Sequence, residues 1–182
     1  MIVVVGFMGA GKTTVGRLLA TGLRQPFVDL DRAIEEDGHR SVRQIFAEEG
    51  EAAFRVIEHQ TLAGILAGPG VVLAVGGGAV EHPESQRLLR AVDVVYLQVG
   101  YAEAVARVGW DAGRPMLARP DLAQVYQRRL AGYESVATVT VATGGRPARA
   151  VCAEVLAGLV KGGGEAGGDR GLPRGDRAGY PR

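Results

Sequence analysis

One glycine-rich segment carries the residue types and the spacing of a phosphate site. From Gly6 to Thr13 the sequence reads GFMGAGKT, which is a glycine, four free positions and then Gly-Lys-Thr. The apolar run 2–5 before it predicts a buried strand, and residues 15–20 after it predict an amphipathic helix. A strand that turns through glycines into a helix points several backbone N–H groups at one place. The segment therefore predicts a site for a polyphosphate.

The side chains of this loop suit phosphoryl transfer. Lys12 can bridge the β- and γ-phosphates of a nucleotide, and the Thr13 hydroxyl can ligate Mg²⁺. A flexible turn that contains Lys-Thr by chance is the alternative, and it is disfavoured because strand, spacing and helix all agree. The residues expected to bind the nucleotide here are Gly9, Ala10, Gly11, Lys12, Thr13 and Thr14.

Two aspartates end the next predicted strand, residues 26–31. Asp29 and Asp31 are two apart, so on an extended segment their side chains can point to the same side. Beside a phosphate site, one can hold Mg²⁺ and the other can accept a proton from, or orient, an attacking hydroxyl. The alternative is a solvated strand end or a helix cap, since Asp31 precedes Arg-Ala-Ile. The neighbouring phosphate loop favours the catalytic interpretation.

Two further patterns are ambiguous on their own. Arg55 and Glu58 are three apart on a predicted helix, where spacing favours an ordinary surface ion pair over a guanidinium held to grip an anion. Gly76, Gly77 and Gly78 follow another predicted strand. A tight turn needs only one glycine, so three in a row indicate that something approaches the main chain closely.

Apolar runs alternate with helical patterns along the whole chain. Strands are predicted at 2–5, 26–31, 71–75, 92–99 and 138–142, and helices at 15–20, 33–37, 42–49, 51–66, 83–90, 102–108, 122–134 and 147–160. Ser41 to Gln44 has the spacing of a capping box at the start of one helix. Strands that are apolar throughout indicate a parallel sheet with helices on both faces. Ligands of such sheets sit beyond the carboxyl ends of the strands, so the motifs above should share one crevice.

Length and composition predict one globular domain. The chain has 182 residues, with 47% hydrophobic and 23% charged. Residues 109–121 show no periodicity and predict a lid or functional loop, flanked by several arginines. Residues 161–182 are rich in Gly, Asp, Arg and Pro and predict a disordered tail, so the domain is expected at 1–160.

Several functional classes are disfavoured. A formal net charge of +1 gives no field for nucleic acid or an anionic membrane, and no apolar run reaches 18 residues. The single cysteine, Cys152, excludes an internal disulfide and is expected in the core. The three histidines, His39, His59 and His82, lack metal-ligand spacing and are expected at the surface. We expect a cytoplasmic monomer that binds neither nucleic acid nor membrane.

Taken in order, these motifs resemble the shikimate kinase family, in the nucleoside monophosphate kinase-like group of P-loop proteins. The resemblance covers about residues 1–160. It depends on the phosphate loop, FVDLD at 27–31, GEAAFRVIE at 50–58, LAVGGGAV at 73–80 and RPML at 114–117. It implies a three-layer α/β/α fold whose five-stranded parallel sheet has the order 2-3-1-4-5, with a mobile lid. It also implies transfer of the γ-phosphoryl of ATP, with Mg²⁺, to the 3-hydroxyl of shikimate, in aromatic amino acid biosynthesis.

The resemblance assigns roles on the nucleotide side. Lys12 and Thr13 would serve ATP and Mg²⁺, and Asp29 would assist the metal. Arg114 of the lid would reach the phosphates as a catalytic residue, and Arg107 would lie against adenine. The segment Arg146–Pro147 would border the adenine site, although a helix start is the plainer interpretation.

The resemblance also assigns roles on the acceptor side. Asp31 would hydrogen-bond the acceptor hydroxyl as the candidate base, and Arg55 would bind the shikimate carboxylate. The backbone at 76–78 would pack on the ring hydroxyls. A second carboxylate-binding arginine precedes a tyrosine on the helix after the lid, which favours Arg129 over its neighbour Arg128. The segment between Arg114 and this helix is a few residues shorter than the family pattern, and the glycine-rich tail has no counterpart.

Two alternatives remain at this point. Gluconate kinase has the same fold and a hydroxylated carboxylate substrate, but the glycine triplet and the spacing of the two aspartates favour shikimate. A non-catalytic nucleotide-binding module that recruits a partner through the tail is the other alternative. The presence of Lys12, Thr13, Asp29 and Asp31 argues against it.

Overall fold

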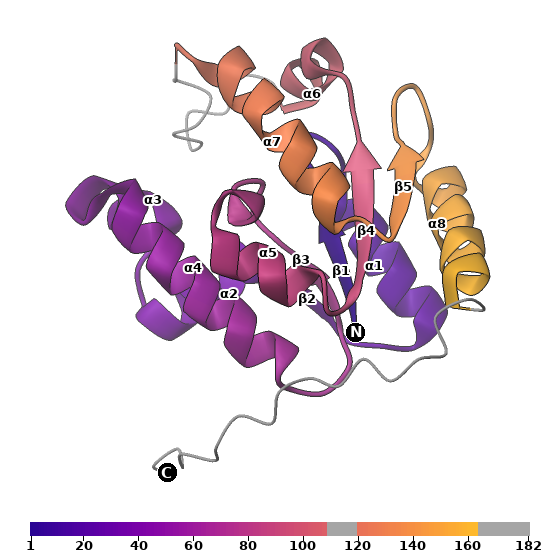
Figure 1. Ribbon diagram of the computed structural model, residues 1–182, viewed down its shortest axis with the longest axis horizontal. Helices are drawn as coiled ribbons and strands as arrows, with labels where there is room; N and C mark the ends of the chain where they lie inside the picture. The colour runs from indigo at the N-terminus through magenta and orange to yellow at the C-terminus, as the bar shows by residue number, and fades with distance from the viewer. Residues whose placement is uncertain (109–119, 164–182) are drawn as a thin grey trace.

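A computed structural model describes residues 1–108 and 120–163 of the chain (Figure 1). Its strands form one parallel sheet in the order β2-β3-β1-β4-β5, which confirms the expected topology. The strands are β1 (Ile2–Val5), β2 (Phe27–Asp29), β3 (Val72–Ala74), β4 (Asp93–Gln98) and β5 (Val139–Ala142). The central strand β1 pairs Val3 with Leu73 on one side and with Val94 on the other. All three side chains are fully buried, as expected for a strand covered on both faces.

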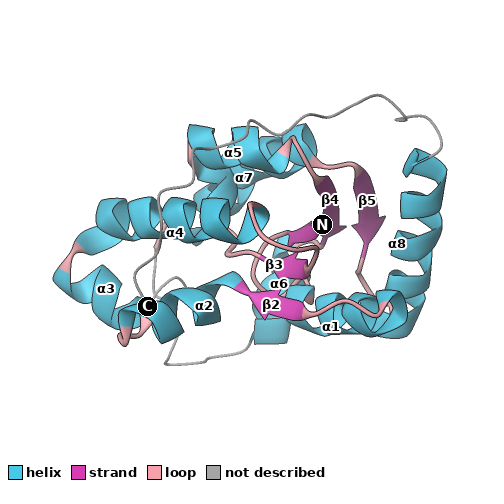
Figure 2. Ribbon diagram, turned by 90° about the horizontal axis from the view of Figure 1, so that it is seen from below, coloured by secondary structure: helices cyan, strands magenta, loops and turns pink. Residues whose placement is uncertain are grey.

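Helices cover both faces of the sheet. They are α1 (Lys12–Leu23), α2 (Leu30–Gly38), α3 (Val42–Glu48), α4 (Gly50–Leu66), the 3₁₀ turn η1 (Ala79–Glu81), α5 (Pro83–Leu89), α6 (Tyr101–Val108), α7 (Leu122–Val136) and α8 (Ala148–Gly163). Figure 2 shows α5 and α7 on one face and α1 on the other, with α8 beside the β5 edge. Helices α2, α3 and α4 extend beyond the β2 edge as a lobe. The three-layer prediction is therefore confirmed, and this lobe frames one side of the site.

Most of the predicted elements are present, with one difference that concerns the site. The strand expected over 26–31 ends at Asp29, and α2 begins at Leu30, so the prediction that Asp31 lies on an extended segment is wrong. Leu30 and Ile34 lie one helical turn apart, and both side chains are buried. Burial of both side chains favours a helix here over a longer strand. Asp31 consequently lies in the first turn of a helix.

Smaller predictions divide in the same way. The capping box at Ser41 and Gln44 is present, and Cys152 is buried in α8. Helix α8 runs to Gly163, three residues past the expected domain end. The calls on the lid and on the tail fall largely on residues 109–119 and 164–182, which lie outside the described residues.

Two further predictions concern the exposure of the histidines and the hydropathy of the helices. His39 is exposed as expected, but His59 and His82 are half-buried and stack with ring centroids 5.0 Å apart, so the surface prediction is wrong for these two. No helix within residues 1–108 and 120–163 combines the length and the apolar character needed to cross a membrane.

Candidate active site

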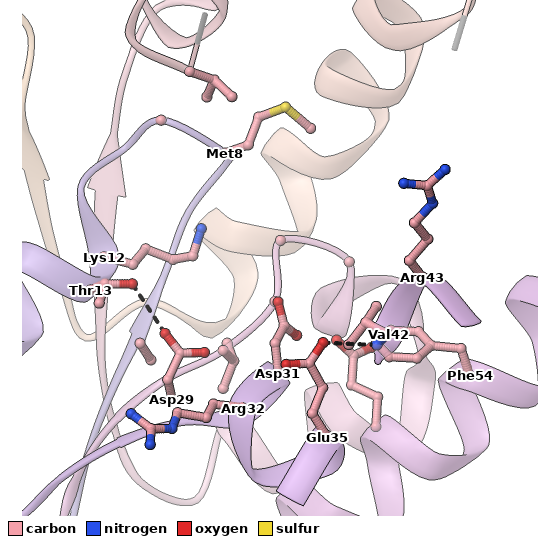
Figure 3. Close-up of a pocket in the computed structure, with 18 of the residues that line it drawn as sticks. Met8, Lys12, Thr13, Asp29, Asp31, Arg32, Glu35, Val42, Arg43 and Phe54 are labelled. Carbon is pink, nitrogen blue, oxygen red and sulfur yellow. Dashed lines mark hydrogen bonds between the residues drawn. The ribbon is translucent and has the colours of Figure 1, made fainter. Parts of the chain in front are cut away.

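A cavity lies beyond the carboxyl ends of β1, β2 and β3. Its volume is about 980 Å³, and its walls come from the phosphate loop, α2, α3, α4, the 76–78 turn, α6 and α7. Figure 3 shows Lys12, Thr13, Asp29 and Asp31 around it. The expectation that these motifs meet in one crevice is confirmed.

The phosphate loop owes its shape to glycine. Gly6 and Gly9 have φ values of 148° and 74°, which residues with a side chain rarely adopt. In addition, a Cβ on Gly6 would lie 2.6 Å from the carbonyl oxygen of Leu97. Helix α1 begins directly at Lys12, and its N-cap, Gly11, supplies no side-chain cap. The start of α1 therefore offers an anion the positive end of the helix dipole.

The polar side chains next to the loop form two small groups. The Lys12 ammonium donates hydrogen bonds to the carbonyls of Gly6 and Phe7, at 3.0 and 3.1 Å, and so lies over the loop. The Thr13 hydroxyl donates to Asp29 Oδ2 at 3.1 Å (Figure 3). A hydroxyl and a carboxylate oxygen side by side are hard ligands of the kind that Mg²⁺ takes together with phosphate oxygens and water.

The described residues form no protein-only metal centre beside Thr13 and Asp29. Within the ranges 1–108 and 120–163, no three His, Cys, Asp or Glu side chains are grouped so that they could hold a metal ion. The donor set of Thr13 and Asp29 consequently fits a metal that arrives with the nucleotide, since phosphate oxygens would complete its coordination.

Asp31 reaches the same cavity from the first turn of α2. Burial, together with the charge of Asp29, raises the pKa of the Asp31 carboxyl, and the Lys12 ammonium partly opposes this shift. Its Oδ1 atom is buried and has no hydrogen-bond partner among the described residues. A buried acceptor with a raised pKa suits a group that receives a hydrogen bond, and then a proton, from a hydroxyl.

The predicted pair of Arg55 and Glu58 is present, but it is not a surface pair. Arg55 Nη1 lies 2.6 Å from Glu58 Oε2, and the Glu58 side chain is only 1% exposed. Burial raises the pKa of Glu58 to about 7, although the charge and hydrogen bond of Arg55 oppose the rise. Arg55 also pairs with Glu51, at 3.0 Å. The guanidinium is thus held from two sides.

A second guanidinium lines the cavity from α7. Arg129 is 4% exposed, and its Nε and Nη2 atoms donate to Glu81 Oε2 at 2.9 and 2.6 Å. Its neighbour Arg128 is exposed and is not among the lining residues. The structure therefore places Arg129, and not Arg128, where a second arginine was expected.

The glycine triplet owes its composition to crowding. A Cβ on Gly76 would lie 2.7 Å from Glu58 Oε1, and one on Gly78 would collide with the guanidinium of Arg55. The Tyr133 hydroxyl donates to the Gly77 carbonyl at 2.6 Å. The close approach inferred from the sequence is thus made by the protein's own side chains, which brings both arginines against the turn.

The remaining predicted nucleotide residues differ in their placement. Arg107 lines the cavity and donates to the carbonyls of Gly9 and Thr143, at 3.2 and 2.6 Å, which ties the phosphate loop to the segment after β5. Arg146 bonds the Ala142 carbonyl at 2.9 Å and is not among the lining residues. Arg114 lies outside the described residues.

At the acceptor end of the cavity, formed by Asp31, Arg55, the 76–78 turn and Arg129, sequence reasoning missed Glu81 and used Tyr133 only to locate Arg129. Glu81 contacts Arg129, and Tyr133 contacts the glycine turn, but no spacing in the sequence indicated either contact. The only available signal for Tyr133 was its position four residues after Arg129, one helical turn on α7. Glu81 carried no signal at all, because its partners come from α4 and α7.

The fold and this site together define a class of protein. The sheet has the order of the P-loop kinases, and a phosphate loop follows β1. The same cavity holds the acidic and basic side chains of the acceptor end. These features together define a P-loop kinase for a small molecule. The sequence model of the family described as shikimate kinase matches residues 8–160. The chain belongs to the shikimate kinase family.

Individual relatives agree with this membership. The shikimate kinase of Pseudomonas syringae pv. syringae is 43% identical over 165 residues, which cover 88% of this chain and 96% of the relative. That of Salinispora tropica is 45% identical over 158 residues, covering 85% and 95%. The solved structure of Acinetobacter baumannii shikimate kinase in complex with shikimate superposes with a TM-score of 0.82, at 34% identity, covering 88% and 92%.

A kinase for another substrate shares the fold. The structure of a gluconokinase from Sinorhizobium meliloti superposes with a TM-score of 0.54, at 21% identity, covering 88% of this chain and 91% of that one. At this level of identity the likeness shows the common fold alone.

Proposed function

We propose that the protein transfers the γ-phosphoryl group of ATP to the 3-hydroxyl of shikimate, giving shikimate 3-phosphate and ADP. Its family acts on shikimate with ATP. The observation that carries the proposal is the shared cavity. A loop for phosphates and two arginines that can bind a carboxylate face the same 980 Å³ space, with Asp31 among its lining residues.

The nucleotide end supplies position and charge. The loop amides and Lys12 would hold the β- and γ-phosphates, so that charge developing on the transferred group meets fixed donors. Thr13 and Asp29 would hold Mg²⁺, which neutralises phosphate charge when bound. Arg114 would contact the phosphates, and Arg107 would lie against adenine.

The acceptor end supplies orientation and a base. Arg55 and Arg129 would bind the planar carboxylate, since a guanidinium matches carboxylate geometry with two parallel donors. Asp31, with its unpartnered Oδ1, would accept the hydrogen bond and then the proton of the attacking hydroxyl. The main chain at 76–78 would meet the other hydroxyls. The structure of the Acinetobacter relative in complex with shikimate supports this assignment of the ligand.

Other parts of the proposal concern the chain as a whole. We propose that it acts as a cytoplasmic monomer, that residues 109–121 form its lid and that Arg146 borders the adenine site. Gluconate remains the alternative acceptor, since it also offers a carboxylate and hydroxyls.

One assay tests the proposed reaction. ADP release from ATP is followed with shikimate, with gluconate and without an acceptor. We expect turnover only when shikimate is the acceptor. Arg55→Ala should weaken shikimate affinity by about 2–5 kcal/mol, since it removes one partner of a buried charged contact. Arg128→Ala, an exposed arginine on the same helix as Arg129, is the matched control and should leave the shikimate KM unchanged. An unchanged KM in Arg55→Ala would show that the carboxylate assignment is wrong.

A further inference from the structure

Glu81 occupies the place between the two arginines of the acceptor end. Its Oε2 atom accepts hydrogen bonds from Arg129 at 2.6 and 2.9 Å and lies 3.8 Å from Nη2 of Arg55. The Nε and Nη2 edge of Arg129, which is the geometry that takes a carboxylate, is therefore already used. One internal carboxylate oxygen serves the two guanidiniums that the proposed function assigns to the carboxylate of the acceptor.

Resident carboxylates already outnumber these two arginines without any ligand. Arg55 and Arg129 face the carboxylates of Glu51, Glu58 and Glu81. An incoming carboxylate would add another negative charge to this cluster, so its binding is unfavourable unless one of the resident carboxylates withdraws.

The three carboxylates differ in their freedom to withdraw. The Glu58 side chain is 1% exposed and fixed in the core of the cluster, whereas the side chains of Glu51 and Glu81 are 40% and 30% exposed. Glu81 also ends the three-residue turn η1, so its side chain can swing outward without unfolding a helix. Glu81 forms ion pairs with both arginines, so its departure would release Arg129 and Arg55 together.

We propose that Glu81 is a resident counter-ion that the carboxylate of the acceptor replaces, and that it thereby sets the affinity and the specificity of the acceptor site. This inference rests on the proposed function. An acceptor with a carboxylate takes over the ion pairs of Arg129 and Arg55 as Glu81 leaves them. A neutral acceptor cannot form these ion pairs. Glu81 therefore stays on Arg129 and disfavours the binding of the neutral acceptor.

Substitution of Glu81 by Gln tests the exchange directly. Glu81→Gln keeps the shape and one hydrogen-bond acceptor but removes the charge with which the ligand competes. Shikimate is titrated calorimetrically into the full-length protein without ATP. We expect Kd to fall about tenfold, the order of magnitude for one partly exposed charge at contact distance. The methyl ester of shikimate should gain no affinity, and Glu81→Ala should change Kd for shikimate in the same direction.

Glu51→Gln is the matched control. It removes the same charge from Arg55, which Glu51 contacts at 3.0 Å, but leaves the Arg129 edge occupied. We expect its Kd for shikimate to change by less than about twofold, because Glu81 still occupies the Arg129 edge in this variant. An equal fall in Kd for shikimate in Glu51→Gln and Glu81→Gln would overturn the proposal. The effect would then come from the loss of any negative charge near the arginines and not from Glu81 in particular.

The outcome for the exchange is separable from the outcome for the reaction. Equal or weaker shikimate binding by Glu81→Gln, with wild-type turnover of shikimate intact, overturns the exchange and leaves the proposed function standing. Wild-type protein that neither binds nor turns over shikimate, with Glu81→Gln behaving in the same way, overturns both.

Discussion

The two ends of the cavity are built by different means. At the nucleotide end, nine consecutive residues, 6–14, supply the loop, and its donors are mainly backbone amides whose direction follows from the strand, the turn and the helix. At the acceptor end, the charged groups are side chains from α2, α4, η1 and α7. The first end depends on local backbone geometry, and the second depends on tertiary packing.

This difference has a consequence for charge. Amides at a helix start carry partial positive charge and need no counter-ion, so the nucleotide end can face its anion directly. Buried guanidiniums need partners before any ligand arrives, and the acceptor end accordingly holds Glu51, Glu58 and Glu81. Changes at the nucleotide end should therefore alter the rate of transfer, whereas changes at the acceptor end should alter shikimate affinity and the pH dependence of stability.

The largest effect is expected for Lys12→Met. Loss of the ammonium leaves the charge of the transferred phosphoryl unmatched in the transition state, so kcat should fall by about 10³-fold, a typical cost of one preorganised donor. The shikimate KM should change little, because Lys12 is not part of the arginine cluster. Steady-state ADP release measures both.

The control uses the other lysine of the chain. Lys161→Met changes an exposed residue at the end of α8 and should leave kcat as it is. If Lys12→Met raised the shikimate KM as much as it lowered kcat, the two ends would not be functionally distinct.

The same contrast explains what the sequence could predict. The phosphate loop, the sheet order implied by the family and most helices follow from contiguous patterns, because strand, turn and helix signals lie within a few residues of one another. Asp31 shows the limit of such local reasoning. Its neighbours were compatible with a longer strand, and only the burial of Leu30 and Ile34 decides for a helix.

The acceptor end was beyond local reasoning. The spacing of Arg55 and Glu58 predicted an exposed pair, whereas packing of α4 under the 76–78 turn buries Glu58. The resemblance to a family gave a role to Arg129, but nothing in the sequence connected it with Glu81, 48 residues away. Long-range ion pairs leave no period in a sequence, so these contacts required coordinates.

The second prediction concerns the pH dependence of stability. The pKa of Glu58 is raised from 4.5 to about 7, so the folded protein binds a proton that the unfolded chain has released between these values. Its contribution is complete below pH 4.5 and is lost as the pH rises to about 7. The free energy of unfolding should fall by up to about 3 kcal/mol across this window.

Chemical denaturation of wild type and of Glu58→Gln at several pH values isolates this contribution. The variant has no proton to release at this position, so the difference between the two free energies should slope across pH 4.5–7 and flatten above it. Asp31, whose pKa is also raised, remains in both proteins and largely cancels. Parallel curves would contradict the assignment of the slope to Glu58.

A third, intermediate effect is expected for Gly78→Ala. The backbone of Gly78 has φ −94°, which any residue adopts, so the added methyl acts only by colliding with the guanidinium of Arg55. The guanidinium can move aside, and we expect the shikimate KM to rise roughly tenfold, as a misplaced binding group commonly costs. The kcat at saturating shikimate should change far less.

Gly64→Ala is the matched control for this substitution. Gly64 lies on α4 with nothing within 4 Å of the position that a Cβ would take. It should leave both KM values unchanged and stabilise the helix by roughly 0.5–1 kcal/mol. A shikimate KM that did not move in Gly78→Ala would mean that Arg55 need not lie against the turn.

The smallest effect is expected at the rim of the acceptor end. The Ser41 side chain accepts a hydrogen bond from the Gln44 amide at 3.2 Å, and the Gln44 side chain accepts one from the Ser41 amide at 2.8 Å, which fixes the start of α3. Ser41→Ala should lower the free energy of unfolding by about 1 kcal/mol. Because α3 contributes Val42 and Arg43 to the cavity wall, fraying there should raise the shikimate KM slightly and leave the ATP KM alone. Denaturant titration and paired KM measurements check both, and an equal rise in the two KM values would show that the rim and the phosphate loop respond as one unit.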